Sequence, residues 1–206
     1  APVGLALVAL IAFLVTRPDP AANEEEPQNP ATVAVSPQGD TPSGDSQEPR
    51  SSELQAAGRR AAEAVLKLGG TVCVGSNFQQ IVDTADLPTE QFIVTKIDLS
   101  KKEGVDDPFL ANFCGLADLQ ILMLTETSIT DRGLANLTDG GRQPLPALQR
   151  LHLDGTTITQ TGLQFLSGSH DLAALQLDET AITEGAVLDQ FPKLTMLGLG
   201  WTPITT

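Results

Sequence analysis

The chain has 206 residues, a formal net charge of −14 and a pI near 4.3. This acidity argues against binding to nucleic acid or to anionic lipid headgroups, because both require clustered lysine and arginine. Two cysteines, Cys73 and Cys114, are too few for a disulfide framework, and neither has the spacing of a zinc ligand. We expect two buried thiols, and the alternative is a single bridge in an exported domain.

Residues 1–16 carry no charge, and Arg17 and Pro18 end this stretch abruptly. Its length falls just short of the roughly 20 residues that a spanning helix needs. We interpret it as a membrane anchor that leaves the rest of the chain on the extracytoplasmic side. The alternative is a cleaved export signal, which has a similar apolar region and would give a soluble exported form.

Residues 17–51 have a different composition. Between Arg17 and Arg50 there are seven prolines and seven acidic residues. Such a segment has almost nothing to bury, so burial cannot offset the entropy lost on ordering it. The sequence therefore predicts a disordered, acidic, proline-rich linker that holds a folded domain away from the membrane.

Residues 52–91 are predicted to form an N-terminal cap of one helix and strands. Ser52 is the expected helix cap, apolar residues follow at helical spacing, and Gly69-Gly70 offers a left-handed stop. Residues 71–74 and 78–83 are typical of short strands. A helix and strands placed here would shield the first coil of a stack from water.

A phrase of the form Leu-x-x-Leu-x-x-Leu-x-Leu-x-x-Thr-x-Ile-Thr recurs four times within residues 92–206. A degenerate unit precedes these four, and the last of them is incomplete. The first leucines of the successive Leu-x-Leu pairs, at positions 122, 151, 175 and 197, are separated by 29, 24 and 22 residues. A period this short predicts a one-dimensional stack of coils rather than a globule around one core.

Each Leu-x-Leu pair has a period of two, which predicts a short strand with both leucines facing inward. Parallel strands cannot be joined by a tight turn, so the rest of each coil must return the chain, and leucines at i,i+3 spacing predict short helices there. One column of threonines after the strands is expected to bond open backbone groups, and a second is expected to cap the returning helices. The first column is Thr127, Thr156, Thr180 and Thr202, and the second is Thr130, Thr159 and Thr183.

These phrases resemble the leucine-rich repeat family, in the variety with Thr in place of the usual Asn and an Ile-Thr-Asp-x-Gly-Leu continuation, found here at 129–134. Later repeats depart from it, since Gln160 and Glu184 replace the Asp. The resemblance implies an α/β solenoid with parallel strands on a concave face and short helices outside. It also implies protein binding and brings no catalytic set to this chain. With an anchor and an acidic spacer, the whole resembles bacterial envelope-anchored proteins.

The residues between and after the inward-facing leucines are expected to line the concave face. Neighbouring strands lie about 4.8 Å apart, so each column forms a contiguous strip. We predict that this strip binds a protein or an envelope component, with methionine and tryptophan as apolar anchors. The alternative is an ordinary solvated sheet face. The predicted binding residues are Met123, Arg150, His152, Asp154, Gln176, Asp178, Glu179 and Trp201.

No catalytic motif is present: the sequence lacks GxSxG, HExxH, a P-loop and GxGxxG. His152, Asp154 and Asp178 could approach a common cation, but the sequence has no tight Asp-x-Asp-x-Asp-Gly loop. We therefore predict a protein that is not an enzyme and that uses no metal and no cofactor.

Two other functions stay open at this point. The last coil is expected to leave Leu194, Leu197 and Leu199 at an uncovered, association-prone end, so the chain could be a structural or self-associating spacer. It could also be the sensor part of a longer signalling protein.

Overall fold

The computed structural model describes residues 48–141 and 145–204. The chain divides into two units, Ala1–Pro42 and Ser43–Thr206, and the described helices and strands belong to the second. The predicted anchor at residues 1–16 and residues 17–47 of the predicted linker lie outside the described residues, whereas residues 48–51, also predicted as linker, belong to a helix. Within the two described ranges, no helix combines the length and the apolar character that a bilayer crossing requires.

The folded unit opens with helix α1 (Glu48–Lys67), which begins before the predicted cap Ser52. The prediction of Ser52 as the cap is wrong because Pro49 is well accommodated in the first turn of a helix, where its missing N–H costs nothing. Ala57, Ala61 and Val65 form the buried side of α1. The left-handed stop is confirmed, since Gly69 has a φ of 71° directly after the helix.

Seven strands form one sheet in the order β2-β1-β3-β4-β5-β6-β7. The first three are β1 (Thr71–Val74), β2 (Gln79–Ile81) and β3 (Val94–Asp98), and β1 runs antiparallel to both of its neighbours. From β3 onward every pair is parallel and in step, with one strand from each coil. The remaining strands are β4 (Ile121–Met123), β5 (Arg150–His152), β6 (Ala174–Gln176) and β7 (Met196–Gly198).

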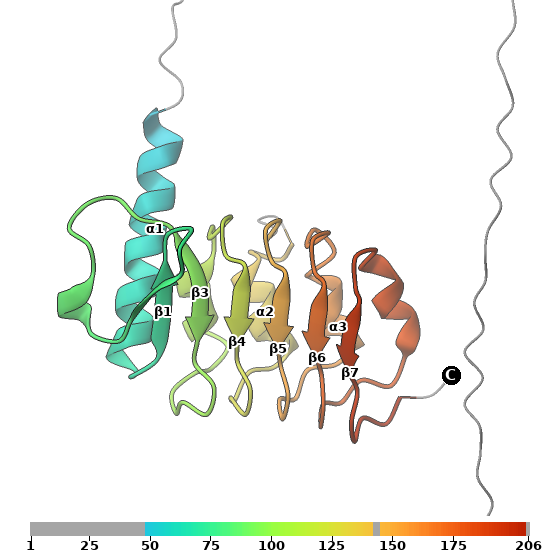
Figure 1. The fold of residues 1–206 in the computed structure, drawn as a ribbon. Coiled ribbons are helices and arrows are strands. Elements are labelled where there is room, and N and C mark those ends of the chain that lie inside the picture. Colours follow the sequence, from blue (N-terminus) through green and yellow to red (C-terminus); the bar gives the residue numbers. More distant parts are fainter. Residues whose placement is uncertain (1–47, 142–144, 205–206) are drawn as a thin grey trace, which may run out of the picture. The chain divides into compact units, whose positions relative to one another are not determined.

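Short helical segments return the chain along the opposite side of the stack from the sheet, as Figure 1 shows. Each return packs against the return of the neighbouring coil, and α1 packs against the first return as well as against β1 and β3. A further single turn, η1 (Thr84–Asp86), lies in the connection between β2 and β3. The returns are η2 (Phe109–Phe113), α2 (Asp131–Leu137), α3 (Gln160–Gln164) and η3 (Gly185–Gln190).

The core is one seam between the sheet and the returns. Both leucines of the Leu-x-Leu pairs in β4, β5 and β6 are fully buried, and so are Leu134, Leu137 and Leu163 on the returning helices. Burying such a side chain contributes roughly 1.5–3 kcal/mol. The predicted stack with inward-facing leucines is confirmed, as is the α/β architecture with a parallel sheet.

The first threonine column closes the turn after each strand. Thr127, Thr156 and Thr180 are buried, and their hydroxyl groups donate to the carbonyl oxygens of Leu124, Leu153 and Leu177 at 2.7, 2.6 and 2.7 Å. Thr202 repeats this bond to Leu199 at 2.7 Å. The predicted role of this column is confirmed.

A second set of bonds ties one return to the next. The Asp107 carboxylate accepts from the backbone N–H and the hydroxyl group of Thr130, both at 2.7 Å. Asp131 accepts the same pair from Thr159 at 2.7 and 2.6 Å. In each case the threonine also caps its own helix, as the sequence predicts.

The pattern weakens in the last return. Gln160 stands in place of the aspartate, and its Oε1 lies 3.4 and 3.3 Å from the Thr183 nitrogen and hydroxyl oxygen. The prediction that Thr183 caps this return is wrong, because η3 starts one residue later and Glu184 occupies the cap position without a side-chain bond. A short 3-10 turn fits the departure of this repeat from the Asp-x-Gly-Leu pattern.

Candidate functional site

The open side of the parallel sheet carries the predicted binding residues. Two rows of side chains cross it in register, because every second residue of each strand points away from the seam. The helical returns lie on the other side of the stack (Figure 1). The central row is Asp98, Met123, His152, Gln176 and Gly198, and the flanking row is Lys96, Ile121, Arg150, Ala174 and Met196.

The predicted residues of these two rows are accessible to different degrees. Arg150 is exposed, whereas Met123, His152 and Gln176 are half-buried among their neighbours. A Cβ atom placed on Gly198 would clash with Oε1 of Gln176, so the Gln176 amide extends over Gly198 of β7. The central row is therefore mainly polar, with Met123 half-buried within it.

Asp154 and Asp178 have structural roles that the sequence did not indicate. Oδ1 of Asp154 accepts from the backbone N–H of Asp178 at 3.1 Å, and Oδ2 accepts from the Thr125 hydroxyl group at 3.2 Å. Oδ1 of Asp178 accepts from the N–H of Gly200 at 2.6 Å. Each carboxylate therefore joins neighbouring coils, which leaves it fewer free lone pairs for a ligand than we expected.

A row of residues with left-handed backbone follows the strands. Each lies two positions after the second inward-facing leucine of its coil. Lys101, Glu126, Glu179 and Trp201 have φ angles of 60°, 53°, 57° and 59°, and Gly155 has 66° at the equivalent position. In the first four coils the N–H of this residue donates to a carbonyl of the next coil at 2.7–2.8 Å. A non-glycine residue in this conformation is uncommon and costs free energy.

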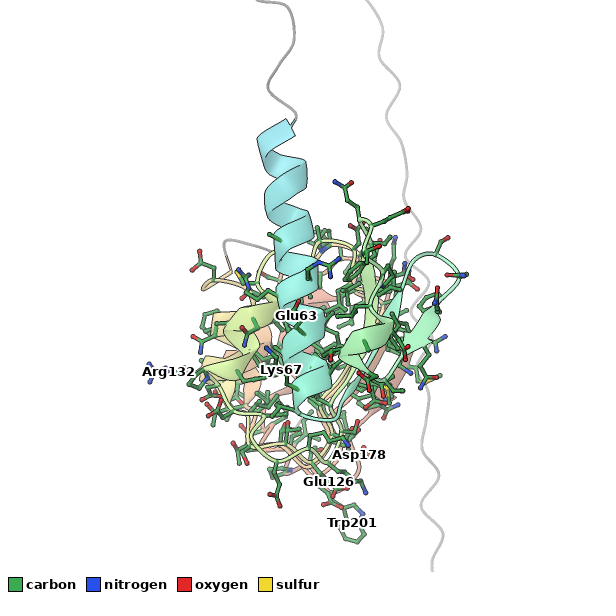
Figure 2. The ribbon with its side chains drawn as sticks, turned by 90° about the vertical axis from the view of Figure 1, so that its left-hand side faces the viewer. Glu63, Lys67, Glu126, Arg132, Asp178 and Trp201 are labelled. Atoms are coloured by element: carbon green, nitrogen blue, oxygen red, sulfur yellow. The ribbon has the colours of Figure 1, made fainter. Side chains whose placement is uncertain are left out.

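The left-handed row presents its side chains to solvent. Lys101 and Glu126 form an ion pair at 2.9 Å, with side chains 69% and 57% exposed. Trp201 is 89% exposed at the far end of the row. Figure 2 shows Glu126, Asp178 and Trp201 at the same end of the folded unit, away from Arg132 on the helical side. The predicted residues Glu179 and Trp201 thus belong to this row, in the column after the strands where the sequence places them.

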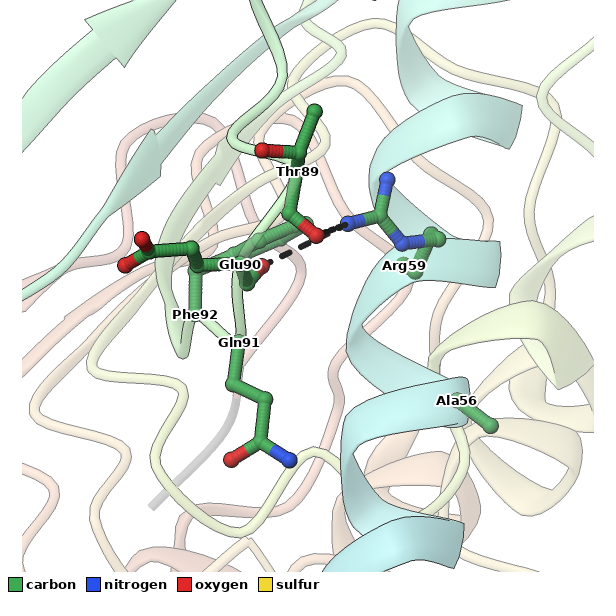
Figure 3. Close-up of a pocket in the computed structure, with 6 residues that line it drawn as sticks. All are labelled: Ala56, Arg59, Thr89, Glu90, Gln91 and Phe92. Atoms are coloured by element: carbon green, nitrogen blue, oxygen red, sulfur yellow. Dashed lines mark hydrogen bonds between the residues drawn. The ribbon is translucent and has the colours of Figure 1, made fainter.

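Recesses also occur outside the two rows of the open sheet face. One of about 200 Å³ lies between α1 and the loop before β3, where Nη2 of Arg59 donates to the Pro88 carbonyl at 2.7 Å. The same nitrogen reaches the carbonyls of Thr89 and Glu90 at 3.5 and 3.4 Å, as Figure 3 shows. The Arg59 guanidinium also lies 5.2 Å from the centre of the Phe92 ring. Arg59 therefore lines this recess and fastens the loop to α1.

Both cysteines are free thiols; Cys73 is buried as predicted, whereas the prediction is wrong for Cys114, which is only half-buried. Burial raises the pKa of the Cys73 thiol above its ordinary value, partly opposed by the nearby Lys96 charge. Burial likewise raises the pKa of Cys114, and the carboxylate of Asp139 adds to the effect. Protonated thiols are poor nucleophiles and poor metal ligands. In the described part of the chain, no three His, Cys, Asp or Glu side chains are grouped so that they could hold a metal ion.

The sequence places these five residues in one column after the strands, but their left-handed backbone was not predicted. The one available signal is Gly155, which occupies the position held by Glu126 in the preceding repeat and Glu179 in the following one. A glycine aligned with acidic residues across repeats indicates a position where the backbone favours a positive φ. The other four residues of the row are not glycines, so their sequence does not indicate a positive φ.

Comparison with known proteins gives little further guidance. No family model and no curated protein matches the chain. Among solved structures, internalin C2 from Listeria monocytogenes shares 21% identity over 74% of this chain and 67% of its own, with a TM-score of 0.39. Internalin F from the same organism shares 20% identity over 48% of this chain, with a TM-score of 0.30, and this chain spans 32% of its length. Likenesses of this size transfer no function.

Proposed function

We propose that this chain is a non-catalytic recognition module whose open sheet face binds a protein or an envelope component. The observation that supports this proposal most strongly is the left-handed row. Its glutamates, lysine and tryptophan occupy backbone positions where glycine costs less, and their side chains project into solvent. Strained backbone positions cluster at functional sites, and the strained residues of this row have exposed side chains.

The chemistry of the surface favours a protein partner. The left-handed row and Asp154 and Asp178 are mainly acidic, Arg150 stands at the opposite margin, and Trp201 offers a large exposed ring. Tryptophan and arginine are enriched among residues that dominate binding energy at protein interfaces. A partner with a basic segment and an apolar contact point would complement this pattern.

Site-specific photo-crosslinking tests the proposal. A photoreactive residue is placed at Arg150 on the sheet face and, as the matched control, at Arg132, which is exposed on α2. We expect a defined protein adduct in intact cells from position 150 and none of that mass from position 132. The crosslinked protein is then purified and its affinity is measured by calorimetry.

For that partner, Arg150→Ala is expected to weaken binding by about tenfold, equivalent to roughly 1.4 kcal/mol, whereas Arg132→Ala leaves it unchanged. Adducts that form only from position 132, or an Arg150→Ala variant with wild-type affinity, contradict binding through the sheet face.

The proposal includes a membrane tether at residues 1–16, which rests on the sequence alone. Deletion of these residues is expected to release the chain from the membrane fraction in alkaline carbonate, while the thermal unfolding of the repeat unit is unchanged. A full-length chain that carbonate extracts as readily as the deletion variant would contradict the tether.

A further inference from the structure

A groove lies in the N-terminal cap, between the β1–β2 hairpin and the loop that leads into β3. The connection from β2 to β3 lies at the opposite end of the folded unit from β7 (Figure 1). Val74 and Gln79, which pair across the hairpin, line one wall, and Pro88, Phe92 and Ile93 of the loop line the other. The volume is about 420 Å³, which is within the range of pockets that take a ligand.

The two walls of this groove are held in place by the cap itself. The backbone N–H of Gly75 donates to the Ile93 carbonyl at 3.0 Å, which joins the hairpin to the loop directly. From the other side of the loop, Arg59 of α1 donates to the Pro88 carbonyl and lies over the Phe92 ring. A groove that is fixed in this way loses little conformational entropy when a partner binds.

The groove is bordered by apolar side chains outside the buried core. Ile93 lines it and is 45% exposed, and Phe78 is 39% exposed between two lining residues, Asn77 and Gln79. Neither Ile93 nor Phe78 belongs to the core cluster. Phe78 also has a φ of 54°, a conformation that strains an aromatic residue and suits glycine. Since strained positions cluster at functional sites, the exposed Phe78 ring points to binding rather than to stability.

The segment that forms the groove is acidic. Residues 75–93 contain Asp83, Asp86 and Glu90, and they contain no lysine, arginine or histidine. Glu90 itself lines the groove. The nearby Arg59 is engaged with carbonyl groups of the loop. An apolar groove with carboxylates beside it is complementary to a large apolar side chain that is accompanied by a basic one.

From these observations we infer that the groove is a second interaction surface, and that its occupant is a segment of a partner protein in which a large apolar residue stands beside lysine or arginine. The apolar side chain packs against Val74, Ile93 and the Phe78 ring, and the basic side chain lies near Glu90. The groove shares no residue with the two rows of the open sheet face, so this contact is independent of binding there.

Selection from a phage-displayed library of short random peptides tests the inference. The library is selected on the immobilised full chain and, separately, on its Phe78→Gly variant. Glycine accepts the backbone conformation at position 78, so this variant loses the ring while the fold is retained, which thermal unfolding checks. We expect the wild type to enrich peptides with a large apolar residue next to lysine or arginine, and Phe78→Gly to enrich none of them.

An enriched peptide is then synthesised with a fluorescent label, and its Kd is measured by anisotropy. Phe78→Gly and Ile93→Ser are each expected to raise the Kd by about tenfold. Val82→Ser is the matched control, because Val82 is an apolar residue of the same connection, 61% exposed, that does not line the groove; it should leave the Kd unchanged. Arg150→Ala, on the sheet face, should also leave it unchanged.

Four results would overturn the inference. The first is that the wild type enriches no peptide that Phe78→Gly fails to enrich. The second is a set of enriched peptides without a basic residue. The third is an equal loss of affinity in Val82→Ser and Ile93→Ser. The fourth is a loss in Arg150→Ala with wild-type affinity in Phe78→Gly, which would place the peptide on the sheet face.

Discussion

Asp154 offers a direct way to separate architecture from recognition. Its carboxylate accepts one bond from the coil before it and one from the coil after it. A hydrogen bond to a charged group contributes roughly 1.5–3 kcal/mol when fully formed. The side chain is 23% exposed, so solvent screening reduces both terms. We therefore expect Asp154→Ala to lower the free energy of unfolding by about 2 kcal/mol.

Urea denaturation followed by circular dichroism gives the midpoint and the slope. For a domain of this size, a loss of about 2 kcal/mol corresponds to a fall in Tm of roughly 4–8 °C. Asp154→Asn keeps an oxygen acceptor for the Asp178 N–H and should lose about half as much. Glu126→Ala removes only an exposed ion pair and should stay within about 0.5 kcal/mol of wild type. If Asp154→Ala unfolds at the wild-type midpoint, the carboxylate does not join the coils, and the cross-coil reasoning fails.

Three further outcomes are expected. Gly155→Ala should destabilise by about 1 kcal/mol in urea, since alanine resists the positive φ that glycine adopts there; a stability equal to wild type would speak against strain. Thr156→Val should cost about 1–2 kcal/mol through the buried carbonyl of Leu153, as measured by thermal unfolding, and a neutral result would discount the column. The pKa values of Cys73 and Cys114 are raised in the folded state, so at alkaline pH the folded state keeps thiol protons that the unfolded state releases. The stability that these thiols contribute is therefore complete at neutral pH. It declines as the pH rises past the ordinary thiol pKa and through the folded one. Urea midpoints that do not fall between neutral and alkaline pH in the wild type, relative to a variant with both cysteines replaced by alanine, would contradict this.

The repeated elements were predictable because their physical causes recur at fixed spacing. A Leu-x-Leu pair has a period of two, which indicates a strand with both leucines on its inner face. The register of Leu122, Leu151 and Leu175 then follows from alignment of the repeats. The Thr156 turn bond was predictable for the same reason. The strand register follows from aligning one coil with the next, and the Thr156 bond has its partner, the Leu153 carbonyl, three residues away in the same coil.

The remainder depends on partners in other coils. Asp154 is a surface carboxylate in any reading of the sequence, and only the stacking of neighbouring turns shows that its oxygens are occupied. The start of α1 was misplaced because proline, a helix breaker in the interior, is accommodated in a first turn. Thr183 was assigned from its repeat position, although the replacement of aspartate by Gln160 had already altered the geometry of that coil.

The carboxylate contacts of Asp107 and Asp131 divide the stack mechanically. Where an aspartate accepts from the threonine of the next coil, the two coils share two short hydrogen bonds. At the following junction the longer contacts of Gln160 replace them. Fraying under heat or load should therefore start beside β7 and spare the coils that carry Met123 and His152. A partner would then contact rigid coils in the middle of the stack and a more easily deformed coil that carries Trp201.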